Sequence, residues 1–239
     1  MMHAFSKAAA RYAEEMGIGL VEAILRERAD LQEGVAKGTL KVAFAEVGKN
    51  AHTVFIGDEV FKGPHLNRNM LNPTSVDAYA KIKATRLSDF ENEIDALKIL
   101  EGSGLPVPRL TCVGNEALFY GMTRMPGVML VDVMETFTPQ QSEALGYALA
   151  HFNIRLAKTL PMKEGKYAKH ADLHKYNILV DEQTHRLTGI IDFGKIMYHG
   201  LDKLASSALD PEFDNALQQE FDRRKSEFPT APDRRMRAP

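Results

Sequence analysis

Residues 170–194, HADLHKYNILVDEQTHRLTGIIDFG, constrain this chain more than any other segment. Two short apolar runs in it flank a polar turn, which is typical of a β-hairpin. Asn177 directly precedes the first run, Asp192 directly follows the second, and Asp172 lies five residues before Asn177. We therefore expect the hairpin to bring Asn177 and Asp192 together, with Asp172 on the loop that enters it.

These three side chains suit the transfer of a phosphoryl group from a nucleotide triphosphate to a hydroxyl. An aspartate can accept the proton of the attacking hydroxyl. Mg²⁺ prefers oxygen ligands, so one carboxylate and one amide can hold it against the nucleotide. Each residue alone is equally explained as a capping aspartate, a turn asparagine or a strand-end aspartate. The full set in this order and spacing favours the catalytic interpretation.

The segments HADLHKYNILVD and GIIDFG resemble the aminoglycoside phosphotransferase and choline kinase-like family, whose motifs are written H-G-D-x-x-x-x-N and D-F/W-G. The resemblance implies an α+β, two-lobed protein-kinase-like fold, with a β-rich N-terminal lobe and a mainly helical C-terminal lobe. It also implies ATP and Mg²⁺ as cofactors, Asp172 as the catalytic base, Asn177 and Asp192 as metal ligands, and His170 as a brace of the loop. Ala171 replaces the family's glycine, a departure from the pattern.

The N-terminal lobe offers a candidate ion pair. The sequence EVFK, which ends at Lys62, resembles the family's strand with the phosphate-binding lysine, although a surface lysine on an edge strand has the same pattern. Glu93 falls on the apolar face of a helix predicted to follow a capping box at Ser88–Glu91 and to end near Gly102. A carboxylate on an apolar face needs a partner, so we predict that Glu93 pairs with Lys62. Glu91 is the alternative partner.

Two further segments are candidate nucleotide contacts. The sequence FYGMTRMPG, residues 119–127, resembles the family's hinge segment. That resemblance implies that backbone groups at Thr123 and Met125 bind adenine. Gly48 and Asn50 lie in a turn that could cover the phosphates, and a simple hairpin turn explains this turn equally well.

The hydrophobic pattern divides the chain into four parts. They are a helical extension at 1–38, an N-terminal lobe at 39–125, a C-terminal lobe at 126–228 and a disordered tail at 229–239. Helices are expected at about 4–16 and 20–34 in the extension, and a three-strand meander is expected at 40–64. A capping box at Thr138 predicts a long helix to about 159, and Pro211 opens a last helix. We expect the nucleotide in the cleft between the lobes.

The composition disfavours several classes of partner. The formal net charge of −2 gives no reason to expect nucleic acid or an anionic membrane. No apolar run approaches the roughly 20 residues that span a bilayer, and the first residues lack the apolar core of a signal peptide. Cys112 is the only cysteine, which suits a reducing compartment. We therefore expect a cytoplasmic protein without a nucleic-acid or membrane partner.

The leading hypothesis is an ATP- and Mg²⁺-dependent phosphotransferase that acts on a hydroxyl of a small molecule, such as an aminoglycoside- or choline-like acceptor. Only 45 residues follow Gly194, fewer than the activation segment and helical subdomain of a conventional protein kinase need. One alternative is a compact atypical protein kinase or ATPase, with a partner protein bound through the N-terminal helices. Another is a nucleotide-binding scaffold without catalysis.

Overall fold

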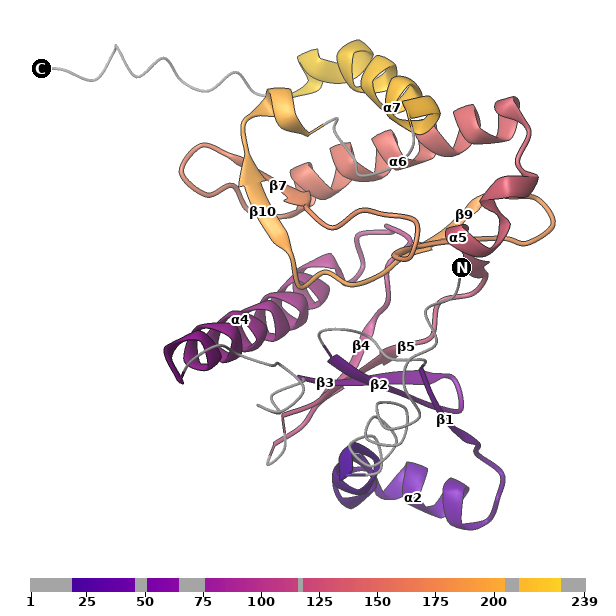
Figure 1. The fold of residues 1–239 in the computed structure, drawn as a ribbon, viewed down its shortest axis with the longest axis vertical. Coiled ribbons are helices and arrows are strands. Elements are labelled where there is room, and N and C mark those ends of the chain that lie inside the picture. Colours follow the sequence, from indigo (N-terminus) through magenta and orange to yellow (C-terminus); the bar gives the residue numbers. More distant parts are fainter. Residues whose placement is uncertain (1–18, 46–50, 65–75, 116–117, 205–210, 229–239) are drawn as a thin grey trace, which may run out of the picture. The chain divides into compact units, whose positions relative to one another are not determined.

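The computed structural model describes residues 19–45, 51–64, 76–115, 118–204 and 211–228 (Figure 1). The helix predicted at 4–16 and the turn with Gly48 and Asn50 lie outside these residues. The chain divides into two compact units. The first unit is Met1–Lys98 with Pro108–Arg124, and the second unit is Ile99–Val107 with Met125–Pro239.

A five-stranded antiparallel sheet forms the first unit, with the strand order β1-β2-β3-β5-β4. Its strands are β1 (Val42–Phe44), β2 (Ala51–Ile56), β3 (Glu59–Pro64), β4 (Leu110–Val113) and β5 (Tyr120–Thr123). The predicted meander is therefore confirmed. Its second turn needs a residue with positive φ, and Gly57 supplies a φ of 59° there.

Two short helices precede the sheet where the sequence predicted one helix over 20–34. Residues 19–27 are helical, and α2 (Ala29–Ala36) follows after a break at Arg28, whose φ and ψ are −121° and 79°. The Arg28 guanidinium donates to Glu59 Oε1 of β3 at 2.8 Å, which holds the break against the sheet. Ile24 and Leu31 are buried in a core with sheet residues Val54, Ile56, Phe61 and Phe119.

The long helix α4 (Val76–Leu100) begins well before the predicted capping box. Ser88 and Glu91 lie inside it, so the prediction that the helix starts there is wrong. The residues upstream, DAYAKIKATRL, are mostly good helix formers, and the helix extends through them. The predicted apolar face is confirmed, since Ile94, Leu97 and Leu100 are buried.

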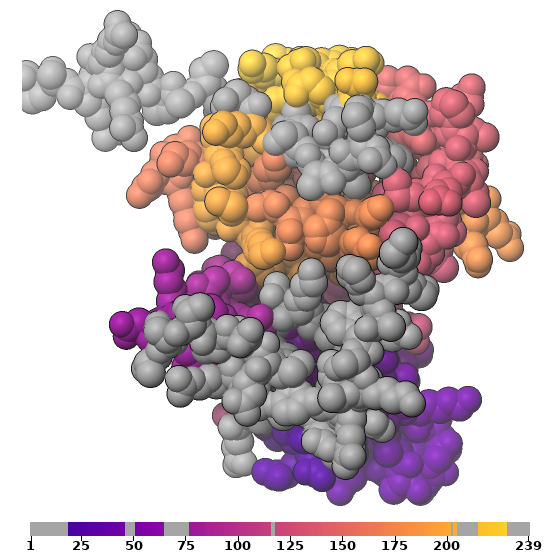
Figure 2. Space-filling model, in the orientation of Figure 1, coloured from indigo at the N-terminus to yellow at the C-terminus, as the bar shows by residue number. Residues whose placement is uncertain are grey.

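The second unit is built around two helices that pack side by side, α6 (Pro139–Thr159) and α7 (Pro211–Arg224) (Figures 1 and 2). The predicted cap of α6 is present: Gln141 N donates to Thr138 Oγ1 at 3.3 Å, and Thr138 N donates to Gln141 Oε1 at 2.8 Å. The buried stripe of α6 includes Leu145, Leu149, Phe152 and Leu156. No described helix is long and apolar enough to cross a bilayer.

Two small antiparallel sheets lie in the second unit. One has the order β6-β8-β9, and the other pairs β10 with β7. These strands are β6 (Val128–Met129), β7 (Tyr167–His170), β8 (Ile178–Val180), β9 (Leu187–Ile190) and β10 (Ile196–His199). The short helices are α5 (Leu130–Val133), η1 (Met134–Thr136), η2 (Leu201–Lys203) and η3 (Lys225–Glu227). The β8–β9 hairpin was predicted; β7 and β10 were not.

Residues 99–107 belong to the second unit, although the sequence placed them in the N-terminal lobe. Ile190 N at the end of β9 donates to Pro106 O at 2.9 Å. Arg155 of α6 donates to Ser103 O at 2.6 Å. These two hydrogen bonds attach the segment to a strand and a helix of the second unit.

Candidate functional site

His170 joins the two chain segments that carry the predicted catalytic residues. Its Nε2 donates to Ile191 O at 3.0 Å, and its Nδ1 accepts from Asp172 N at 3.3 Å. The side chain is fully buried and packs edge-on against Phe193, at 4.9 Å between ring centroids. Burial lowers the pKa of His170, which favours the neutral imidazole. The two hydrogen bonds place the proton of the neutral ring on Nε2. These contacts agree with the predicted bracing role.

Asn177 closes the loop that begins at Asp172. Its Nδ2 donates to Asp172 O at 2.9 Å, while its backbone O accepts from Ile191 N at 3.0 Å. The residue is buried, so these bonds fix the orientation of its amide. Because Nδ2 is used inside the loop, Oδ1 is the atom that can act as an oxygen ligand.

Asp192 follows β9 at the same end of the hairpin as Asn177. Ile178 pairs with Ile190 in the register of β8 and β9, and Ile191 N donates to Asn177 O at 3.0 Å, so Asp192 comes one residue after the neighbour of Asn177. The backbone of Asp192 has a φ of 69°, a left-handed conformation that is uncommon outside glycine and is found at many functional positions. The charges of Asp172 and Asp192 both act on His170 to raise its pKa, against the larger effect of burial. Asp172 and Asp192 therefore lie near His170, and Asn177 is hydrogen-bonded to the backbone of Asp172.

A lysine that the sequence did not single out contacts the predicted base. Lys195 Nζ donates to Asp172 Oδ2 at 2.8 Å, and His174 Nε2 lies 3.7 Å from Asp172 Oδ1. Lys195 directly follows Gly194 of the D-F-G sequence, which is the signal that could have marked it. The contact depends on the pairing of β10 with β7, in which Ile196 lies opposite His170.

The donor set fits Mg²⁺. Asn177 offers an amide oxygen and Asp192 a carboxylate, both hard ligands at one end of a hairpin. Mg²⁺ commonly takes one or two such protein ligands and completes its shell with water and phosphate oxygens. In the described parts of the chain, no group of three His, Cys, Asp or Glu residues is arranged to hold a metal.

In the first unit, the predicted pairing of Lys62 with Glu93 is confirmed. Lys62 Nζ lies 2.9 Å from Glu93 Oε1 and 3.0 Å from Oε2. Both residues are buried, at 9% and 4% exposure. Lys62 lies on β3, which pairs with β2 on one side and β5 on the other, so the edge-strand alternative is wrong. Glu91 is exposed, so this alternative partner is wrong as well.

The predicted adenine contacts lie where β5 ends. Thr123 N donates to Arg109 O at 2.9 Å, and Thr123 Oγ1 accepts from Arg109 N at 2.9 Å. These bonds engage the Thr123 amide and hydroxyl within the first unit. Met125 is the first residue of the second unit after this strand. Gly48 and Asn50 belong to the part of the chain that the structure leaves undescribed, so their role stays a prediction.

Solved structures of low sequence identity share the fold. The streptomycin–ATP–APH(2″)-IIa ternary complex has a TM-score of 0.59 at 14% identity and covers 83% of both chains. ADP-bound aminoglycoside phosphotransferase APH(2″)-Ib has a TM-score of 0.56 at 15% identity, again over 83% of both chains. WbdD bound to the kinase inhibitor LY294002 has a TM-score of 0.51 at 20% identity, over 79% of this chain and 46% of that chain. The predicted α+β, two-lobed protein-kinase-like fold is therefore confirmed.

The sequence comparisons refine the expected family. An aminoglycoside 3′-phosphotransferase from Streptomyces ribosidificus is 39% identical over 56 residues, which are 23% of this chain and 21% of that protein. The chain thus matches about a fifth of this relative's length, and the specific aminoglycoside phosphotransferase and choline kinase-like family is not confirmed. The family model of the RIO domain matches residues 70–232. Because this match spans more than half of the chain and includes Asp172, Asn177 and Asp192, the chain belongs to the RIO domain family.

Proposed function

We propose that this protein is an ATP- and Mg²⁺-dependent phosphotransferase that moves the γ-phosphate to a hydroxyl. The observation that carries the proposal is the arrangement around His170. Asn177 Nδ2 binds the Asp172 carbonyl at 2.9 Å, and Asp192 follows the strand that pairs with the strand after Asn177. A proton acceptor and two oxygen ligands on one hairpin and the loop that enters it are the parts that phosphoryl transfer needs.

Each residue then has a chemical role. Asp172 accepts the proton of the attacking hydroxyl, and His170 holds the loop that presents it. Asn177 Oδ1 and the Asp192 carboxylate hold Mg²⁺, which supplies positive charge to the phosphate oxygens when it is bound. Lys62, oriented by Glu93, binds the α- and β-phosphates. Backbone groups near Met125 bind adenine.

For the acceptor, the first candidate is the hydroxyl of a small molecule, of the aminoglycoside- or choline-like kind. Two findings support it: the fold is shared with aminoglycoside phosphotransferases, and the local sequence match is to an aminoglycoside 3′-phosphotransferase. Under this proposal, the acceptor places its hydroxyl against the Asp172 carboxylate.

The second candidate is an atypical protein kinase or ATPase that works with a partner protein. The match to the RIO domain favours it. The sequence suggested that such a partner binds the N-terminal helices. In the described part of this region, Ile24 and Leu31 are buried against the sheet, so a partner bound there would contact the exposed faces of these helices.

The substitution Asp172→Asn tests the proposed function. It should lower kcat for Mg²⁺-dependent ADP release by about 10²- to 10⁴-fold, the usual contribution of general-base catalysis, with the KM for ATP little changed. Asp222→Asn, an exposed aspartate on α7, is the control and should behave as wild type. Near-normal kcat in Asp172→Asn would refute the assignment.

The same assay separates the two candidates. Stimulation of ADP release by one member of a panel of hydroxyl compounds, such as aminoglycosides, choline and sugars, supports the first. Transfer of labelled phosphate to protein without stimulation by any compound supports the second. ATP binding in the absence of any turnover would instead support a scaffold.

A further inference from the structure

Lys195 contacts Asp172, the proposed base, and the roles assigned so far do not include this lysine. Its backbone is fixed: Ala171 N donates to Lys195 O at 2.9 Å, and the next residue, Ile196, pairs with His170. Its Nζ donates to Asp172 Oδ2 at 2.8 Å. The strand pairing of β10 with β7 therefore holds an ammonium group beside the catalytic carboxylate.

Stability does not explain this ion pair. The side chains of Lys195 and Asp172 are 44% and 24% exposed. An ion pair with this exposure usually stabilises a fold by about 0–1 kcal/mol, because water screens the charges and two side chains lose freedom. A fixed positive charge beside a reacting phosphoryl group has a much larger effect, since losing one such group typically lowers kcat about 10²- to 10³-fold.

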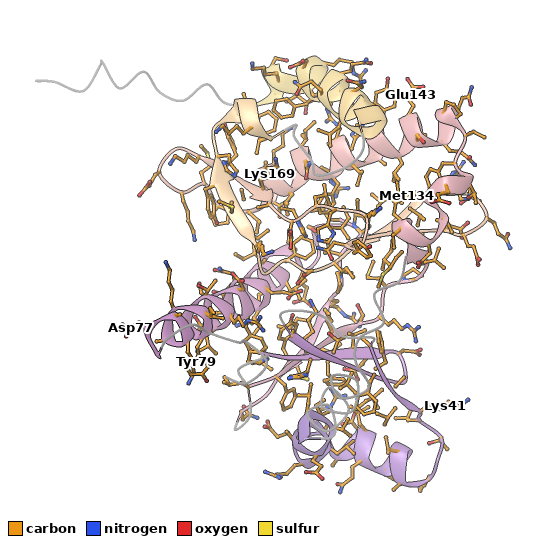
Figure 3. The ribbon with its side chains drawn as sticks, in the orientation of Figure 1. Lys41, Asp77, Tyr79, Met134, Glu143 and Lys169 are labelled. Carbon is orange, nitrogen blue, oxygen red and sulfur yellow. The ribbon has the colours of Figure 1, made fainter. Side chains whose placement is uncertain are left out.

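Neighbouring lysines of the second unit have other contacts. Lys169 of β7, labelled in Figure 3, is buried, and its Nζ donates to Lys203 O at 2.9 Å. Lys163 lies over the ring of Tyr198, 4.7 Å from its centroid. Among these described lysines, Lys195 has its ammonium at Asp172.

The distances of the reaction allow Lys195 to reach the transferred group. A hydroxyl that gives its proton to Asp172 lies about 2.6–3.2 Å from the carboxylate. In a near-attack arrangement, the same oxygen is about 3–3.5 Å from the phosphorus. An ammonium at 2.8 Å from this carboxylate is thus a close neighbour of the phosphoryl oxygens. A lysine ammonium has three N–H donors, so one ammonium can donate to a carboxylate and to a phosphoryl oxygen at the same time.

We propose that Lys195 is a catalytic residue whose ammonium bridges Asp172 and the phosphoryl group during transfer; this rests on the proposed function. The acceptor oxygen forms a bond to the γ-phosphorus, and the bond from that phosphorus to the β,γ-bridging oxygen breaks. The electron pair of the broken bond stays with ADP, and the hydroxyl proton passes to Asp172 and then to solvent. Lys195 keeps its proton and stabilises the negative charge on the phosphoryl oxygens.

The test compares Lys195→Met and Lys195→Arg with Lys166→Met. Lys166 is an exposed lysine in the loop that leads into β7, and it serves as the control. The measurements are steady-state Mg²⁺-dependent ADP release, with water and the protein's own hydroxyls as acceptors, and thermal unfolding. Lys195→Met should lower kcat about 10²- to 10³-fold, with the KM for ATP and the Tm close to wild type. Lys195→Arg should regain much of the loss, because it restores the cation.

The outcomes are distinct for the two proposals. A kcat for Lys195→Met within threefold of an active wild type would overturn the role of Lys195 and leave the proposed function standing. A loss that Lys195→Arg does not relieve, with a matching fall in Tm, would also overturn it, because that pattern indicates a structural role. A folded wild-type protein that releases no ADP with Mg²⁺ and ATP, either alone or with any compound of the acceptor panel, and that transfers no phosphate to protein would instead refute the proposed function itself.

Discussion

Lys62 and Glu93 form a buried ion pair whose geometry determines whether it stabilises the fold. Burying two charges costs several kcal/mol per ion, and their attraction offsets this cost only when the geometry is good. Here the ammonium contacts both carboxylate oxygens, at 2.9 and 3.0 Å. The pair therefore depends on both partners, and removing one leaves a buried charge without its counterion.

We predict that Lys62→Met destabilises the protein by about 3–5 kcal/mol, the usual effect of breaking a buried pair. The double variant Lys62→Met/Glu93→Leu should recover most of this loss, because it buries no charge. Urea unfolding measures both effects. The double variant should still fail to release ADP normally if Lys62 binds phosphate. Normal turnover in the stable double variant would show that the pair is structural only.

The sequence predicted one of these charge contacts and missed another. Glu93 lies on an apolar helix face, and this local pattern was enough to predict a buried partner. The contact of Lys195 with Asp172 was missed because it depends on strand pairing between distant segments. The periodicity near Lys195 carries no sign of that pairing.

Among the secondary-structure elements, the β8–β9 hairpin positions the candidate site, and β6 pairs with β8 along one side of this hairpin. Gly127 directly precedes β6 and has a φ of 102°. A Cβ at this position would lie 2.5 Å from Val180 O at the end of β8, closer than any real contact. Gly127 thus has two reasons to be glycine, its backbone conformation and its close approach to the hairpin.

Gly127→Ala should therefore destabilise the protein more than Gly165→Ala. Gly165 also has a positive φ, of 73°, but nothing lies within 4 Å of a Cβ added there. Gly165→Ala should cost about 1 kcal/mol from backbone strain, and Gly127→Ala should cost clearly more because of the clash. Denaturant unfolding of both variants checks this, and equal losses would show that the hairpin adjusts easily.

Elements with a strong local signal were predicted well. The capping residues of α6 and the alternating strands of the first unit are local features, and the structure has them. The start of α4 was misjudged because Ser88 and Glu91 have capping-box spacing inside a run of helix formers. The strands β7 and β10 have only four residues each and were not predicted. Their pairing is non-local, so neither segment reveals it alone.

On the scale of the whole molecule, the buried neutral His170 couples stability to pH. Its pKa in the folded state is lowered by burial from a usual value of 6.5. As the pH falls below 6.5, the unfolded chain binds a proton that the folded chain does not, so the free energy of unfolding decreases. The slope for one such group is at most about 1.4 kcal/mol per pH unit.

Urea unfolding between pH 7.5 and about 5 should show this decrease, and His170→Gln should flatten it. Glu220 affects stability only at lower pH. Hydrogen bonds from Arg223 lower its pKa below the usual 4.5, so its contribution to the free energy of unfolding is lost as the pH falls through that lowered pKa. His199→Gln is a control with a less buried histidine. An unchanged slope in His170→Gln would contradict the neutral assignment.

The proposed phosphotransferase activity depends on Mg²⁺ bound by Asn177 and Asp192. The most direct test is ADP release as a function of Mg²⁺ concentration in wild type and Asp192→Ala, with the exposed Asp222→Ala as control. We predict turnover that saturates with Mg²⁺ in wild type and control. In Asp192→Ala, kcat should fall about 10²-fold or more, because the carboxylate ligand is lost. A folded Asp192→Ala protein with wild-type kcat and the same Mg²⁺ dependence would contradict the account.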